Sequence, residues 1–174
     1  MQTTVPTTAL DIYRSLPEGT RCEVLYNQLS MSPSPTTEHQ LISFKLSGIL
    51  FVFLEKNKKG IALAAPTDVY FESEQSVVQP DLLIVLNENK SIISKDGIYG
   101  APDIIFEILS VNRKYDTLKK KTLYEKAGVK EYFIIDPSDN TVTLFAFNGS
   151  NRYEIIYEEK GRILSDTLGC DLHL

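Results

Sequence analysis

The sequence predicts an α/β protein, an α+β arrangement in which a mixed sheet is flanked by helices within a single domain, residues 1–174. Three observations support this fold class. The 174 residues are 43% hydrophobic, with 9 Gly and 8 Pro, which is typical of globular domains and not of disordered or collagen-like chains. Apolar stripes at helical spacing occur together with short apolar runs of strand length. A chain of this length buries roughly 70% of the surface that its unfolded form exposes, enough for a core of its own.

The first 30 residues predict a helix and a hairpin. Residues 1–7 are polar, and we expect a flexible tail there. Residues 8–16 have a short helical pattern that ends at a Pro-Glu-Gly sequence. Residues 23–29 have the pattern of a β-hairpin, with Asn27 at a turn position that requires a positive φ.

A long helix is predicted from Thr37 to about Lys56. Thr37 and Gln40 have the spacing of a capping box, which predicts the start of the helix. Five apolar residues at helical spacing follow, so one face is expected to be buried. Cationic residues and Gly60 are typical of a helix C-terminus and predict its end.

The remainder of the chain is predicted to supply most of the sheet. Short apolar runs between polar turn residues are typical of strands. One polar, lysine-rich helix interrupts them and is expected to end at Gly128. The predicted strands are residues 61–63, 67–71, 77–86, 103–109, 132–137, 141–147 and 153–157, and the predicted helix is residues 114–127.

Charge and cysteine content exclude several kinds of protein. Lys and Arg total 18 against 23 Asp and Glu, a net charge of −5, so a site for a polyanion must be a local patch. Cys22 and Cys170 stand far apart and outside any zinc-binding spacing, which argues against a disulfide scaffold or a structural zinc. The most apolar stretch, residues 46–54, is far shorter than the ~20 residues of a membrane span, and no leader pattern precedes it. We expect a cytoplasmic protein with no membrane partner.

Asp81 and Glu107 are acidic residues inside apolar strand segments. A carboxylate in such a strand costs several kcal/mol unless it has a cation, a metal or access to solvent. If the two strands are neighbours, both carboxylates can bind one Mg²⁺ ion. Alternatively, each acid ends its strand in solvent or pairs with a structural Lys or Arg. Asp103 is not expected to share an ion with Glu107, because four strand residues span roughly 13 Å.

Residues 113–130 form a basic segment in this acidic chain. Seven Lys and Arg residues stand there against Asp116 and Glu125, as contact with a phosphate backbone requires. The alternative is a solvated helix face, since Asp116 and Lys120 are four residues apart and can pair. Asp116, Lys120 and Tyr124 share one helical face, so the helix can direct Lys120 toward the two strand acids.

His39 follows Glu38 near the start of the long predicted helix. It could assist a proton transfer, or it could be a histidine of the capping region without a chemical role. The sequence contains no glycine-rich phosphate loop, no Gly-x-Ser-x-Gly elbow and no Cys/His dyad.

Several linked segments are similar to one known family, and together they run from about Leu10 to Tyr157. They are Glu23-Val24-Leu25, Met31-Ser32-Pro33 with Glu38-His39-Gln40, Val77-Val78-Gln79-Pro80-Asp81-Leu82, Gly100-Ala101-Pro102-Asp103 with Glu107-Ile108-Leu109-Ser110, the trio Asp116, Lys120 and Tyr124, and Ala127-Gly128-Val129-Lys130-Glu131-Tyr132 with Asp136-Pro137. With these segments the chain resembles the Uma-type family of putative restriction endonucleases, in the PD-(D/E)XK nuclease superfamily.

The resemblance implies a restriction-endonuclease-like PD-(D/E)XK core. Asp81 would be the motif aspartate and Glu107 the motif glutamate, and both would hold Mg²⁺ or Mn²⁺. The superfamily usually has a lysine two residues after this glutamate, where this chain has Leu109. The resemblance assigns that role to Lys120 on the following helix, with Lys119 and Lys121 as substitutes.

Further residues would support the site. Ser110 matches the family pattern, and Glu23 would be an extra ligand or a water-orienting acid. Asn27 and Gln28 replace the Gly and Glu that the family often has in the first hairpin, and Gln28 lacks the charge. The basic segment would contact the nucleic-acid backbone through Arg113, Lys114, Lys119 and Lys121.

These implications predict a Mg²⁺- or Mn²⁺-dependent endonuclease that hydrolyses phosphodiester bonds in DNA, with Asp81, Glu107 and Lys120 as catalytic residues. Analogy with nucleases that cut both strands predicts a homodimer. The alternative is a catalytically inactive nuclease-fold module that binds nucleic acid or a protein partner. Stabilisation by a divalent metal would separate the two functions.

Overall fold

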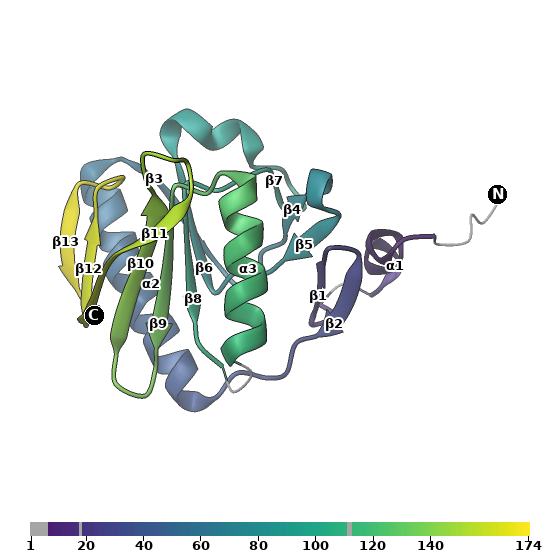
Figure 1. Ribbon diagram of the computed structural model, residues 1–174, viewed down its shortest axis with the longest axis horizontal. Coiled ribbons are helices and arrows are strands. Elements are labelled where there is room, and N and C mark those ends of the chain that lie inside the picture. The colour runs from purple at the N-terminus through teal and green to yellow at the C-terminus, as the bar shows by residue number, and fades with distance from the viewer. Residues whose placement is uncertain (1–6, 18, 111–112) are drawn as a thin grey trace.

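The computed structural model describes residues 7–17, 19–110 and 113–174, and the side chains of residues 113–117 lie outside the described part. Two long helices, α2 (Thr37–Asn57) and α3 (Arg113–Ala127), cover opposite faces of a large sheet (Figure 1). A smaller sheet carries the short helix α1 (Ala9–Ser15) beside the β1–β2 hairpin. The predicted α/β class, with mixed sheets flanked by helices, is confirmed.

The large sheet has the strand order β11-β10-β9-β8-β6-β3. All neighbours pair antiparallel except β8 and β9, which are parallel and are connected by α3. A parallel pair needs such a crossover connection, and the lysine-rich helix supplies it. The strands are β3 (Gly60–Ala64), β6 (Leu82–Leu86), β8 (Ile104–Ile108), β9 (Glu131–Asp136), β10 (Thr141–Phe147) and β11 (Tyr153–Lys160).

The central strands are buried on both faces, so alternate residues enter two different cores. Leu82, Ile84 and Phe106 pack with the inner face of α2. Leu83 and Ile105 pack in the other core, to which α3 contributes Leu123 and Tyr124. This alternation decides on which face of the sheet an acid inside β8 lies.

The smaller sheet has the order β2-β1-β5-β4-β7. In the β1–β2 turn, Tyr26 and Asn27 have φ values of 49° and 59°, so the predicted positive φ at Asn27 is confirmed. The strands are β1 (Cys22–Leu25), β2 (Gln28–Met31), β4 (Val69–Phe71), β5 (Ser76–Val78) and β7 (Ile98–Tyr99), and two 3-10 turns, η1 (Glu72–Glu74) and η2 (Asn87–Ile92), follow β4 and β6.

The prediction of one continuous strand over residues 77–86 is wrong. β5 ends at Val78 in the smaller sheet and β6 begins at Leu82 in the large sheet. Pro80 lies in the connection, where its missing N–H removes a donor that a continuous ladder would need. The break places Asp81 at the junction of the two sheets.

Three further details of the chain differ from the expectation. Thr7, predicted as part of a flexible tail, donates its backbone N–H to Asp11, while residues 1–6 lie outside the described residues. The N-cap of α2 is Thr36, one residue before the predicted capping box. A hairpin of β12 (Arg162–Ser165) and β13 (Cys170–His173) follows β11 and was not predicted. Among the described helices, none has the length and apolar character needed to cross a membrane.

Candidate active site

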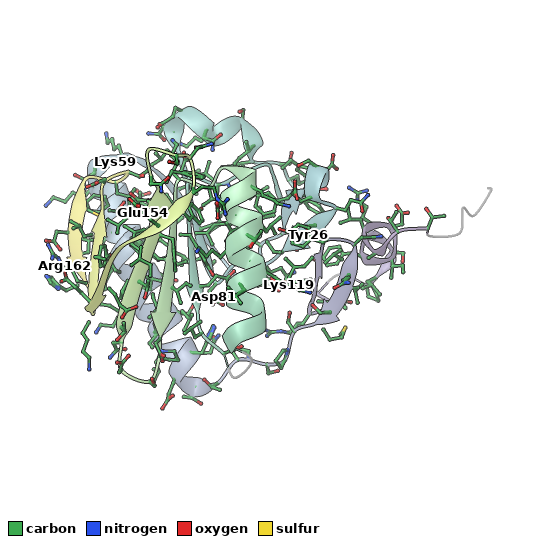
Figure 2. All side chains as sticks on the ribbon, in the orientation of Figure 1. Tyr26, Lys59, Asp81, Lys119, Glu154 and Arg162 are labelled. Carbon is green, nitrogen blue, oxygen red and sulfur yellow. The ribbon has the colours of Figure 1, made fainter. Side chains whose placement is uncertain are left out.

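Asp81 and Glu107 meet where β6 and β8 run side by side. Leu82 pairs with Phe106 in the antiparallel register, and one further step brings Asp81 opposite Glu107. Directly opposed residues on antiparallel strands have Cβ atoms about 5 Å apart. The two acids therefore lie beside each other at one end of the β6–β8 pair. This meets the condition that their strands are neighbours. Figure 2 shows the position of Asp81 relative to α3.

Asp81 is held by its backbone surroundings and by α2. The Ile108 backbone N–H donates to Asp81 Oδ2 over 2.7 Å, and His39 Nε2 lies 3.1 Å from the same oxygen. The hydroxyl of Thr36 accepts from the His39 backbone N–H, so the cap of α2 fixes the position of His39. The hydrogen bond to Asp81 raises the pKa of His39. In the part of the chain that the structure describes, the buried His39 Nδ1 has no partner.

Glu107 faces α3, since it has the same parity in β8 as Ile105. Lys120 Nζ and the Tyr124 hydroxyl donate to Glu107 Oε1 over 3.0 and 2.7 Å. Both donors lie on one face of α3, four residues apart. At the position two residues after Glu107, Leu109 packs against the core beside α3. The cation beside the glutamate thus comes from the helix and not from the strand.

Glu23 on β1 brings the smaller sheet to the same site. Lys120 Nζ lies 3.0 Å from Glu23 Oε1, which also accepts the Gln79 backbone N–H over 2.7 Å. Lys120 therefore links an acid of each sheet. Gln79 is held in turn by Asp68, which accepts from its side-chain amide and from the Tyr13 hydroxyl.

The site contains more acid than base. Glu23, Asp81 and Glu107 share the ammonium of Lys120 and the imidazole of His39. Burial, opposed by Lys120, raises the pKa of Glu107 to about 7, and the charges of Asp81 and Glu23 add to the shift. Burial alone would lower the pKa of Lys120, but Glu107 and Glu23 raise it well above its usual value. The protein thus disfavours a further negative charge here unless a proton or a cation accompanies it.

The donor set fits part of a shell for a hard divalent cation. The hydrogen bonds described above reach Asp81 through Oδ2 and Glu107 through Oε1, so each carboxylate has a second oxygen to offer. Their side chains are 18% and 13% exposed, so the carboxylates are not sealed from solvent. Within residues 7–17, 19–110 and 113–174, no group of three His, Cys, Asp or Glu side chains is arranged to hold a metal ion by itself. Water and substrate oxygens would supply the other ligands, as is usual for Mg²⁺.

The remaining predicted site residues lie at varying distances from the acids. Ser110 is exposed beyond the end of β8. Lys119 donates to Gln28 of the β1–β2 hairpin over 3.2 Å, and Figure 2 shows Lys119 and Tyr26 on that side of α3. Lys121 lies over the ring of Phe145 on β10, 4.6 Å from the ring centroid. Arg113, Lys114 and Asp116 have side chains outside the described residues.

Asp103 has hydrogen-bond and ion-pair partners of its own, away from Asp81 and Glu107. This agrees with the expectation that it does not share an ion with Glu107. Asp103 is 2% exposed, accepts the Leu86 backbone N–H over 2.8 Å and pairs with Lys130 Nζ at 2.7 Å. Its oxygens thus have a buried donor and a cation of their own.

Two contributors to the site were not among the predicted site residues. Tyr124 was placed on the same helical face as Lys120, and this spacing was a usable signal for its hydrogen bond to Glu107. Gln79 acts through its backbone N–H and through a side chain bound to Asp68. No local pattern in the sequence indicates those contacts, because they join segments far apart in the chain.

The chain is similar to a known protein family and to solved structures. A family model named Uma2, described as "Putative restriction endonuclease", matches residues 10–174. A crystal structure of a putative nuclease belonging to DUF820 from Anabaena variabilis has a similar fold, with a TM-score of 0.76 and 18% sequence identity. The match covers 97% of this chain and 94% of that chain. No curated protein sequence matches this chain.

Proposed function

Because the chain belongs to the Uma2 family of putative restriction endonucleases, we propose that it is a metal-dependent endonuclease that hydrolyses phosphodiester bonds in DNA. The observation that carries this proposal is the meeting of Asp81, Glu107 and Lys120 at the junction of the two sheets. Two acids on adjacent strands beside a lysine match the residues of a PD-(D/E)XK site, although the lysine comes from α3.

Asp81 and Glu107 would hold Mg²⁺ or Mn²⁺ through their second carboxylate oxygens. When bound, such an ion neutralises charge on the scissile phosphate and activates a water molecule as the nucleophile. His39 and the Ile108 N–H keep Asp81 in one orientation, and Tyr124 does the same for Glu107. Holding both ligands in place before the substrate arrives lowers the cost of reaching the reactive geometry.

Lys120 would stabilise the negative charge that develops on the phosphate during hydrolysis. Its ammonium already lies 3.0 Å from Glu107, so a phosphate oxygen beside that carboxylate comes within its reach. Glu23 also lies 3.0 Å from the ammonium and would orient it or a water molecule. The neighbouring Lys119 and Lys121, together with Arg113 and Lys114, would contact the nucleic-acid backbone.

The test is cleavage of supercoiled and linear DNA with Mg²⁺, with Mn²⁺ and with a chelator. We compare the wild type with Asp81→Asn, Glu107→Gln and Lys120→Gln, which keep the size or a hydrogen-bond donor of each side chain. Each should lower the rate by at least about 10²-fold, the usual effect of removing one electrostatic contributor to the transition state. Chelation should abolish cleavage in the wild type.

Matched controls are exposed residues of the same charge. Glu154→Gln on β11 and Lys90→Ala in η2 should cleave at the wild-type rate (Figure 2 labels Glu154). Cleavage that persists in Asp81→Asn would indicate a contaminating nuclease and overturn the proposal. Salt-sensitive DNA binding without cleavage under any of these conditions would instead support the non-cutting nuclease-fold module.

A further inference from the structure

Helix α2 carries an apolar stripe on the side that faces away from the large sheet. Leu41, Phe44, Phe51 and Val52 are 67%, 84%, 61% and 64% exposed. The opposite side of the helix, through Leu46, Leu50 and Leu54, is buried in the core. Single exposed apolar residues are ordinary, but a contiguous set with two phenylalanines on one face marks an interaction surface.

Gly48 lies in the middle of the stripe. Phe44 and Val52 lie four residues before and after this glycine, whereas the positions that mirror Leu41 and Phe51 hold the exposed charged residues Glu55 and Lys45. The space where a Gly48 side chain would stand is open. Because the separation of packed helices depends on the side chains at the contact, a central glycine lets a second helix approach closely.

Charges at the two ends of the helix are complementary. Glu38 is exposed in the first turn, and Lys56 and Lys58 are exposed at the last turn and just beyond it. Glu38 and Lys58 each lie ten residues from Gly48. If two copies of α2 pack antiparallel with Gly48 at the crossing, Glu38 of one copy faces Lys58 of the other at both ends. A parallel pair would place like charges together.

We infer that α2 is a homodimerisation helix whose partner is α2 of a second copy, packed antiparallel across a two-fold axis near Gly48. Such an interface is isologous, so Phe44 of one copy meets Val52 of the other and this contact occurs twice. His39 lies on the buried side of α2, so the interface does not use the residues of the candidate active site. The pairing would hold whether or not that site cuts DNA.

The first experiment measures self-association by sedimentation equilibrium over a range of concentrations. The wild type should form a concentration-dependent dimer, and Phe44→Glu should weaken the dimer by about 100-fold or more, because the charge enters the interface twice. The matched control is Ile155→Glu, which changes an apolar side chain of 56% exposure on β11 and should leave the dimer unchanged. Circular dichroism confirms that each variant is folded.

A monomeric wild type at all concentrations up to millimolar would overturn the inference and leave the stripe to a different protein. A dimer that Phe44→Glu does not weaken would also overturn it, since the two copies would then meet through another surface.

Charge reversal tests the orientation of the two helices. Glu38→Lys and Lys58→Glu should each weaken the dimer by about tenfold, since each changes two exposed ion pairs. The double variant restores opposite charges at both ends and should recover most of the wild-type affinity. If the double variant does not recover, the antiparallel arrangement is wrong.

Discussion

Asp103, immediately before β8, and Glu107, near the end of β8, lie four residues apart, and their surroundings differ in one respect that decides what each can do. Asp103 has its own lysine, Lys130, and a buried backbone donor. Glu107 shares Lys120 with Glu23 and lies opposite Asp81. A buried acid with a cation of its own is complete as a structural element. Acids that outnumber their cations instead leave room for a positively charged ligand.

The lysines of the two acids should therefore differ in their contribution to stability. Lys120→Met leaves two buried acids without an ammonium, and we expect it to lower the free energy of unfolding by about 3–5 kcal/mol. Lys130 is half exposed, and Asp103 keeps the Leu86 N–H, so Lys130→Met should cost about 1 kcal/mol. Urea unfolding of both variants without metal measures the difference. Equal losses would show that the two acids have equivalent surroundings.

The second way to sharpen the comparison is the pH dependence of stability without metal. Burial raises the pKa of Glu107 to about 7 from its usual 4.5. Between these values the folded protein keeps a proton that the unfolded chain releases, so stability falls as the pH rises from about 4.5 to 7. We expect this group to contribute a loss on the order of 3 kcal/mol.

Glu107→Gln cannot titrate and should lack that part of the loss. The raised pKa of His39 also favours the folded state at low pH, so the comparison between wild type and variant isolates the share of Glu107. Thermal unfolding from pH 5 to 8 gives both curves. Parallel curves for the two proteins would mean that Glu107 is ionised throughout this range.

The central pair of acids could be predicted from the sequence because each interrupts a short apolar run. Asp81 and Glu107 stood out by the cost of placing a carboxylate in such a run, and adjacent strands were the condition for their meeting. The structure meets that condition through the register of β6 and β8. Lys120 was recognisable because helical spacing places it on the same face as Tyr124.

Other contacts depend on how distant segments pack and had no local signal. The link between Lys120 and Glu23 exists only because the β1–β2 hairpin of the smaller sheet lies beside α3. The chain passes between the sheets at Pro80, where a continuous apolar run had predicted one strand. The hairpin of β12 and β13 was not predicted, although Ile163 is fully buried against the α2 side of the sheet.

The smallest expected effect is the stabilisation by metal, and it distinguishes the two acidic sites most directly. A ligand that binds only the folded state at ten times its dissociation constant adds about 1.4 kcal/mol, or about 3–5 °C in melting temperature for a chain of this size. Mn²⁺ should raise the melting temperature of the wild type and of Asp103→Asn by similar amounts, because Asp103 already has its cation. Asp81→Asn removes a proposed ligand and should show no shift. If Asp81→Asn is stabilised as much as the wild type, the ion binds elsewhere, and the excess of acid around Glu107 is balanced by a proton.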